Sequence, residues 1–270
     1  MVVQHNMAAS NANRQLGIST NTLSKSTEKL SSGYRINRAA DDAAGLSISE
    51  KMRSQIRGLN KASSNAQDGI SAIQTAEGAL NEAHSILQRM NELATQSAND
   101  TNTTADRTAV QSEVNALTNE LSRIASTSQF NTQNLLDGTF TSKNLQVGAL
   151  ENQKITISIG TMNAKALGVD SLDVKSFTKA GAAMKLIQKA ISKVSGQRSD
   201  LGALQNRLEH TVNNLDNISE NTQTAESRIR DTDMASEMVQ YSATSIIQQA
   251  GQSMLAQANS QTQGVLSLIQ

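Results

Sequence analysis

The chain has 270 residues, 37% of them hydrophobic and 2% aromatic, with 24 basic side chains against 24 acidic ones and neither proline nor cysteine. So few large apolar side chains argue against a thick globular core, and the absence of proline is typical of long uninterrupted helices. The balanced charge argues against nucleic acid or an anionic membrane as a partner, and the lack of cysteine excludes disulfides and thiolate metal sites.

Residues 1–40 predict the amino-terminal half of an inner helical domain, followed by a joint. The start of this segment, MVVQHNMAASNANRQL, has neither the basic stretch nor the apolar stretch of a cleaved secretory signal. Leu16, Leu23 and Leu30 fall on one heptad face. A face this thin leaves an isolated helix marginal in water, so we expect order here only when something covers these leucines.

Residues 30–59, LSSGYRINRAADDAAGLSISEKMRSQIRGL, interrupt the helical pattern with charges and glycines. Asp41 or Asp42 is suited to cap the helix that follows, and Arg35 and Arg38 are suited to pair with these carboxylates or with a neighbouring subunit. The spacing is equally compatible with a capped turn whose charges are solvated and with a joint between subunits.

Residues 41–178 predict outer rod helices and one small β-hairpin. Between two predicted helices, SANDTNTTADR is suited to a turn, with Thr104 or Asp106 as the N-cap of the second helix. Further on, KNLQVGA and KITISIG alternate apolar and polar residues, which predicts the hairpin. The two helices carry heptad seams, one of Ile73, Ala76, Leu80, Ala83, Leu87, Met90 and Ala94 and the other of Val110, Val114, Leu117, Leu121 and Ile124.

Residues 179–232 predict one long carboxyl-side rod helix, and its part from roughly residue 180 to 230 would be about 75 Å long at 1.5 Å per residue. Together with the two shorter seams, this helix predicts a mainly α fold, a long antiparallel helical rod with coiled-coil packing. Its seam runs through Ile187, Ala190, Val194, Gln197, Leu201, Leu204, Leu208, Thr211, Leu215, Ile218, Thr222, Ala225 and Ile229.

Residues 233–270 predict the carboxyl-terminal half of the inner domain, paired with the amino-terminal helix. The segment sets scattered apolar side chains among many Gln, Ser and Asn residues, and we expect the two terminal helices to be completed by copies of the same chain. The candidate assembly residues here are Met238, Ile247, Met254, Leu255, Val265 and Leu268.

Three long stretches resemble bacterial flagellin, the subunit of the flagellar filament. They are LSKSTEKLSSGYRINRAADDAAGLSISEKMRSQIRGL, DGISAIQTAEGALNEAHSILQRMNELATQSAN and the ending DTDMASEMVQYSATSIIQQAGQSMLAQANSQTQGVLSLIQ. The resemblance implies a minimal flagellin, because GVDSLDVKSF passes almost directly into the long helix where many members insert surface domains. It further implies an extracellular location in the flagellum and export, without a cleaved signal peptide, through the flagellar channel.

The resemblance also implies partners. These are further copies of the chain in a helical filament, a filament cap, junction proteins and an export chaperone that sheathes the carboxyl-terminal helix from Met238 onward. No membrane partner and no nucleic acid is implied.

Flagellins of many bacteria are recognised by Toll-like receptor 5, at a motif matched here by LQRMNELATQ and at an acidic residue on the next helix. Arg89, Leu93 and Glu113 stand at the matching positions. Asn91 stands where many receptor-active members have a second arginine, and Thr95 where they often have valine, which weakens the expected binding. Spacing alone favours a seam role for Leu93 and a solvated charge for Arg89.

No enzymatic function is expected, and no cofactor. The histidines are far apart with no HExxH pattern, and neither a phosphate-binding glycine loop nor a GxSxG elbow occurs. Two alternatives to a filament subunit stay open. One is a hook-filament junction protein, and the other is a soluble coiled-coil adaptor, which predicts closed oligomers of fixed size.

Overall fold

The computed structural model describes residues 6–269, without the side chains of Thr262, Gln263 and residues 265–269. This part of the chain is mainly helical, as predicted, and divides into two compact units. The terminal unit comprises Met1–Ser54 and Asn221–Gln270, and the central unit comprises Gln55–Glu220. The elements in order are α1 (Met7–Ser32), α2 (Ala43–Ser97), α3 (Thr104–Thr127), β1 (Gln129–Phe130), β2 (Gln133–Asn134), β3 (Lys143–Gln146), β4 (Lys154–Ile157), α4 (Ala164–Leu167), α5 (Phe177–Arg230) and α6 (Met234–Ile269).

The boundary between the two units falls inside α2 and inside α5. The boundaries of the four segments predicted from the sequence fall near the ends of helices. The first turns of α2 and the last turns of α5 belong to the terminal unit, and the remainder of both helices belongs to the central unit. Within the described residues, no helix combines the length and the apolar character that crossing a membrane needs.

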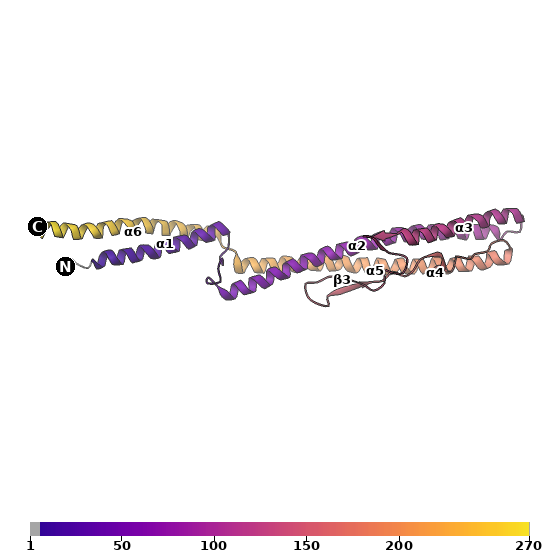
Figure 1. Ribbon diagram of the computed structural model, residues 1–270, viewed down its shortest axis with the longest axis horizontal. Helices are drawn as coiled ribbons and strands as arrows, with labels where there is room; N and C mark the ends of the chain where they lie inside the picture. Colours follow the sequence, from indigo (N-terminus) through magenta and orange to yellow (C-terminus); the bar gives the residue numbers. More distant parts are fainter. Residues whose placement is uncertain (1–5, 270) are drawn as a thin grey trace. The chain divides into compact units, whose positions relative to one another are not determined.

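In the terminal unit, α1 and α6 lie side by side, which confirms the predicted pairing of the terminal helices (Figure 1). They are antiparallel, because Asn6 near the start of α1 bonds to Ala258 late in α6, and Lys29 late in α1 pairs with Glu237 early in α6. Gly33 ends α1 in the left-handed conformation, with φ 75°, where a side chain would be strained.

In the central unit, α2, α3 and α5 share one apolar core with the β strands and α4. All seven predicted seam residues of α2 are buried there, and α3 contributes Val114 and Leu121. Along α5 the predicted seam is largely right, but it fails at one turn, where Ile218 is 37% exposed and the neighbouring Ser219 is buried.

The predicted hairpin is present as β3 and β4, which pair antiparallel with Leu145 opposite Ile155. Its inward side chains on β4, Ile155 and Ile157, are buried. A second antiparallel pair, β1 with β2, was not predicted, because two-residue strands leave no alternation to detect.

The N-cap of α3 is Thr103, so the expectation of Thr104 or Asp106 is wrong by one position or more. Thr103 and Asp106 form a capping box, in which each side chain accepts a hydrogen bond from the other residue's backbone N–H. This contact lowers the pKa of the Asp106 carboxyl, chiefly through the hydrogen bond from the Thr103 side chain.

Candidate assembly and recognition surfaces

Most of the large apolar side chains that the described structure leaves exposed belong to the terminal unit. On α6, Val239 is 71% and Ile246 is 67% exposed. Positions separated by seven or eight residues lie on one side of a helix, so Val239, Ile246 and Met254 share a side. We call these three, together with the exposed Met238 and Ile247 on either side of them, the α6 apolar face.

The fully buried side chains at the α1–α6 contact are small and polar, and half-buried leucines such as Leu16 lie beside them. Ser19 and Ser26 of α1 and Thr244 of α6 are buried in it. The Gln248 side-chain amide donates to Thr20 Oγ1 at 3.2 Å. Gly251 lies so near α1 that a Cβ there would stand 3.5 Å from Leu16 Cδ1. Such contacts fix the register of the pair but bury little apolar area, so they contribute little stability.

The predicted assembly residues therefore fall into two sets. Leu16, Leu23, Leu30 and Leu255 are half-buried. Met238, Ile247 and Met254 are exposed instead. The side chains of Val265 and Leu268 lie outside the described residues. Apart from Ile36, no hydrophobic residue described in the terminal unit is fully buried.

The adjacent carboxylates at the joint have different roles. Asp42 Oδ1 accepts a hydrogen bond from the Gly45 N–H at 2.8 Å and caps α2, as one of the two predicted options. Asp41 Oδ2 accepts from the backbone N–H groups of Asn37 and Arg38 at 3.2 and 3.0 Å and closes the preceding turn. The Arg38 hydrogen bond is the main cause of the lowered pKa of the Asp41 carboxyl.

The predicted pairing of the arginine side chains with these aspartates does not form. Arg38 Nε donates to Glu28 Oε1 at 2.9 Å. The Arg35 side chain donates to the carbonyl oxygen of Ile229, and its backbone N–H donates to the carbonyl oxygen of Arg230. The aspartates are already engaged by backbone N–H groups, and the arginines reach farther along the chain. Arg35 thus joins the amino- and carboxyl-terminal parts of the terminal unit.

Arg230 is a joint residue that the sequence did not single out. Its side chain is 13% exposed, Nη1 donates to Glu50 Oε1 at 2.8 Å, and the guanidinium lies 4.7 Å from the centroid of the Tyr34 ring. The hydrogen bond from Arg230 is the main cause of the lowered pKa of the Glu50 carboxyl. Because its partners lie far away along the chain, no local motif marks Arg230.

The structure brings two of the three receptor-contact candidates together. Arg89 Nη2 on α2 donates to Glu113 Oε1 on α3 at 2.9 Å, and Arg89 Nη1 contacts Glu92 at 3.2 Å. Glu113, followed by Glu92, raises the pKa of the Arg89 guanidinium. Both members of the Arg89–Glu113 pair are about half exposed. Leu93 is 1% exposed and belongs to the core, so a partner cannot reach it in this packing.

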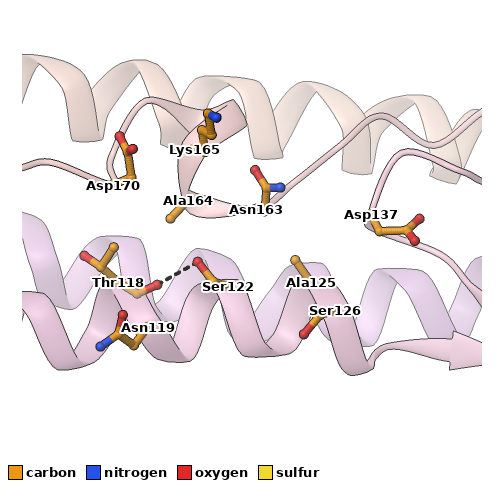
Figure 2. A pocket seen from close by; sticks show the side chains of 10 residues that line it. All are labelled: Thr118, Asn119, Ser122, Ala125, Ser126, Asp137, Asn163, Ala164, Lys165 and Asp170. Atoms are coloured by element: carbon orange, nitrogen blue, oxygen red, sulfur yellow. Dashed lines mark hydrogen bonds between the residues drawn. The ribbon is translucent and has the colours of Figure 1, made fainter.

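A cavity of about 300 Å³ lies between α3, the loop at Asp137 and the segment 163–170 (Figure 2). Small polar side chains of α3 face Asn163 and Ala164 across it, and a hydrogen bond of 3.1 Å joins Ser122 Oγ to the Thr118 carbonyl. The α3 hydroxyls that line it, those of Thr118, Ser122 and Ser126, each donate to a backbone carbonyl of their own helix. Among the described residues, histidines and carboxylates nowhere gather in threes that could hold a metal ion.

Comparisons with known proteins cover almost the whole chain. Residues 3–141 match the family model of the bacterial flagellin N-terminal helical region, and residues 184–269 match that of the C-terminal helical region. The chain is 55% identical to a flagellin of Halalkalibacterium halodurans and 50% identical to the flagellar filament 33 kDa core protein of Treponema phagedenis, in both cases over 100% of the two chains. The crystal structure of Bacillus cereus flagellin is similar with a TM-score of 0.50 and 30% identity, over 56% of this chain and 88% of that one.

Proposed function

Because the chain belongs to the bacterial flagellin family and is a structural subunit of the flagellar filament, we propose that its terminal unit drives polymerisation. The observation that carries this proposal is the α6 apolar face, which remains exposed although α6 is already paired with α1. A helix with an uncovered apolar stripe is completed by another surface, and here that surface belongs to further copies of the chain.

The energetic scale supports assembly through this face. Burying one large apolar side chain contributes about 1.5–3 kcal/mol. The five side chains of the face are 53–71% exposed, so burying what remains of them contributes about 5–9 kcal/mol, which is on the scale of the ~4–15 kcal/mol that association costs in lost freedom of motion. A contact that repeats head to tail without closing generates an open filament. Folding of the terminal unit and assembly are coupled, because the contacts that stabilise it are made between subunits.

The test is filament formation by the purified full chain after ammonium sulfate seeding, followed by electron microscopy. We expect filaments from the unmodified chain and none from the double variant Val239→Glu/Ile246→Glu, because each new carboxylate would be buried without a partner. The matched control, Gln188→Glu/Ser195→Glu, adds the same two charges with the same seven-residue spacing at exposed polar positions of α5, outside the α6 apolar face, and should still assemble.

Filaments from the Val239→Glu/Ile246→Glu variant would show that the α6 apolar face is not an assembly surface. Closed oligomers of fixed size from the unmodified chain would instead favour the coiled-coil adaptor. The identities of 50% and more to a flagellin and a filament core protein do not favour the adaptor or a hook-filament junction protein.

We further propose that the Arg89–Glu113 pair is the part of the chain that Toll-like receptor 5 contacts. The pair is about half exposed on α2 and α3, whereas Leu93 is buried in the core. Arg89→Ala should lower receptor activation in a reporter-cell assay. Arg123→Ala is the matched control, because Arg123 is similarly exposed and paired with Glu120 on α3. An equal loss in both variants would argue against a specific contact.

We also propose that the chain reaches the cell exterior through the flagellar export channel without a cleaved signal peptide. An export chaperone that covers the α6 apolar face from Met238 onward would keep subunits apart until they reach the filament cap. The same Val239→Glu/Ile246→Glu variant should then lose chaperone binding. The flagellin family is structural, and we propose no catalytic activity and no cofactor.

A further inference from the structure

A second pocket, of about 260 Å³, lies in the central unit beside the two strand pairs. Its lining includes the side chains of Phe130, Phe140, Leu145 and Ile157, so two of the chain's three phenylalanines gather at one place. Both rings are only half-buried. Pockets that hold drug-sized ligands occupy about 300–1,000 Å³, so this smaller one is better suited to a protruding side chain.

The backbone beside this pocket is strained. Asn131 and Thr132 have φ of 46° and 61°, and Ser142 has φ of 53°. A β-branched residue such as Thr132 is unfavourable in the left-handed region, where glycine is the ordinary choice. Asn131 and Thr132 form the two-residue loop between β1 and β2, where a positive φ at both positions is the usual hairpin geometry, so the strain falls on Thr132 and Ser142 and not on Asn131.

The turn between β3 and β4 presents an apolar side chain on an ordered support. Leu150 is 67% exposed at this tip. The Gln146 amide donates to the carbonyl oxygens of Gly148 and Leu150, and the Leu150 N–H donates to Gln153 Oε1 at 3.0 Å. These hydrogen bonds already hold the turn in one conformation. Burying Leu150 against a partner therefore costs little further conformational entropy, which favours docking.

Charges at the tip complement charges at the pocket. The tip carries Glu151 and, at the start of β4, Lys154, and the pocket lining includes Lys143 and Asp68. Lys143 pairs with Ile157 at the end of the hairpin opposite to the tip, so the tip does not reach the pocket of its own chain.

We propose that the β3–β4 tip of one copy inserts Leu150 into the Phe130–Phe140 pocket of a second copy, with Glu151 beside Lys143. This inference rests on the proposed assembly function and deepens it by naming a contact between central units. The tip and the pocket are different surfaces of the chain, so each copy offers both, and the contact can repeat from copy to copy, building an open filament where the rotation between copies does not close a ring. It is therefore compatible with an open filament.

The chain has no cysteine, so engineered cysteines report on this contact without background. The full-length variants Glu151→Cys and Lys143→Cys keep Leu150 and the phenylalanines in place. They are mixed, assembled with ammonium sulfate, oxidised and separated on a non-reducing gel. A disulfide needs Cα atoms within about 7 Å, so we expect a covalent dimer from the mixture and from neither variant alone. In the control mixture, the Lys143→Cys variant is exchanged for Lys189→Cys. Lys189 is exposed on α5 outside the pocket, so this mixture should give no dimer.

Charge exchange provides a second readout. Glu151→Lys and Lys143→Glu should each raise the critical concentration for assembly by about 3- to 10-fold, because each places like charges together. The double variant Glu151→Lys/Lys143→Glu should return the critical concentration close to that of the unmodified chain. Both residues are exposed, so the helical content of the monomer should stay unchanged.

The outcomes separate the two proposals. Filaments that show neither the Glu151→Cys/Lys143→Cys cross-link nor rescue in the charge-exchanged double variant would overturn the docking of the tip and leave the filament function intact. Absence of filaments from the unmodified chain would overturn both. A cross-link together with rescue supports the contact as described.

Discussion

Two neighbouring aspartates at the joint stabilise different parts of the backbone, and this difference is measurable. Asp42→Ala should lower stability by about 1 kcal/mol, the usual cost of losing an N-cap, because the Gly45 N–H loses its acceptor. Hydrogen exchange of the first turn of α2 should accelerate accordingly. Asp42→Asn keeps a capping oxygen and is the matched control. If Asp42→Ala leaves exchange in this turn unchanged, the cap assignment is wrong.

The Arg230–Glu50 contact makes the terminal unit sensitive to acid. The hydrogen bond from Arg230 lowers the pKa of Glu50 from 4.5. The stabilisation is therefore complete above about pH 4.5 and is lost as the pH falls through the lower pKa of the folded state. We expect the melting temperature of the unmodified chain to fall more steeply below pH 4.5 than that of Glu50→Gln. Identical pH profiles would contradict a role for this carboxylate.

At this scale, the sequence predicts local roles better than distant partners. The capping role of Asp42 was predictable, because a cap depends on residues within one turn. The partners of Arg35 and Arg38 were not, because a long side chain chooses among groups that tertiary structure brings near. The Arg38 side chain contacts Glu28, and Arg35 contacts the carbonyl oxygen of Ile229.

At the scale of helices, heptad spacing predicted the seams because burial follows helical periodicity. It failed near Ser219 of α5, where polar contacts with α2 replace apolar ones. Ser219 Oγ donates to Asn60 Oδ1 at 2.8 Å, and Ser63 Oγ donates to Asp216 Oδ1 at 3.0 Å. The side of a straight helix that faces its partner shifts gradually along a strict seven-residue repeat. At this turn the shift favours burial of position 219, although position 218 carries the apolar side chain.

Gln111 of α3 fixes the connector before α5, and no pattern in the sequence marks it. Its amide donates to the carbonyl oxygen of Leu172 and its side-chain oxygen accepts from the Val174 N–H, both at 2.8 Å. Gln111→Ala would leave two buried backbone groups unpaired, at about 1–3 kcal/mol each. We expect destabilisation by about 2–6 kcal/mol in denaturant unfolding followed by circular dichroism.

The neighbouring Ser112→Ala is the control for this prediction. Ser112 is exposed and donates to the Thr108 carbonyl of its own helix, so its loss should change stability by less than about 0.5 kcal/mol. Equal effects of the two substitutions would mean that Gln111 does not hold the connector.

At the scale of the whole chain, apolar burial is unequally shared between the two units. Thirty buried hydrophobic residues form one cluster in the central unit, whereas Ile36 is the one described hydrophobic residue fully buried in the terminal unit. Local stability follows such burial. The central unit should therefore be the more stable of the two, and the terminal unit should gain more from contacts with further copies.

This inequality predicts the order of amide hydrogen exchange. In the monomer, α1 and α6 should exchange before the buried seam of α2 at residues 73–94, because few apolar contacts hold them. In filaments at about 100 times the critical concentration, binding stabilises the subunit by about 2.7 kcal/mol, which slows exchange about 100-fold. The slowing should concentrate in α1 and α6. Mass spectrometry of peptides from monomers and filaments measures both, and equal protection of α6 in the two states would mean that assembly does not cover its apolar face.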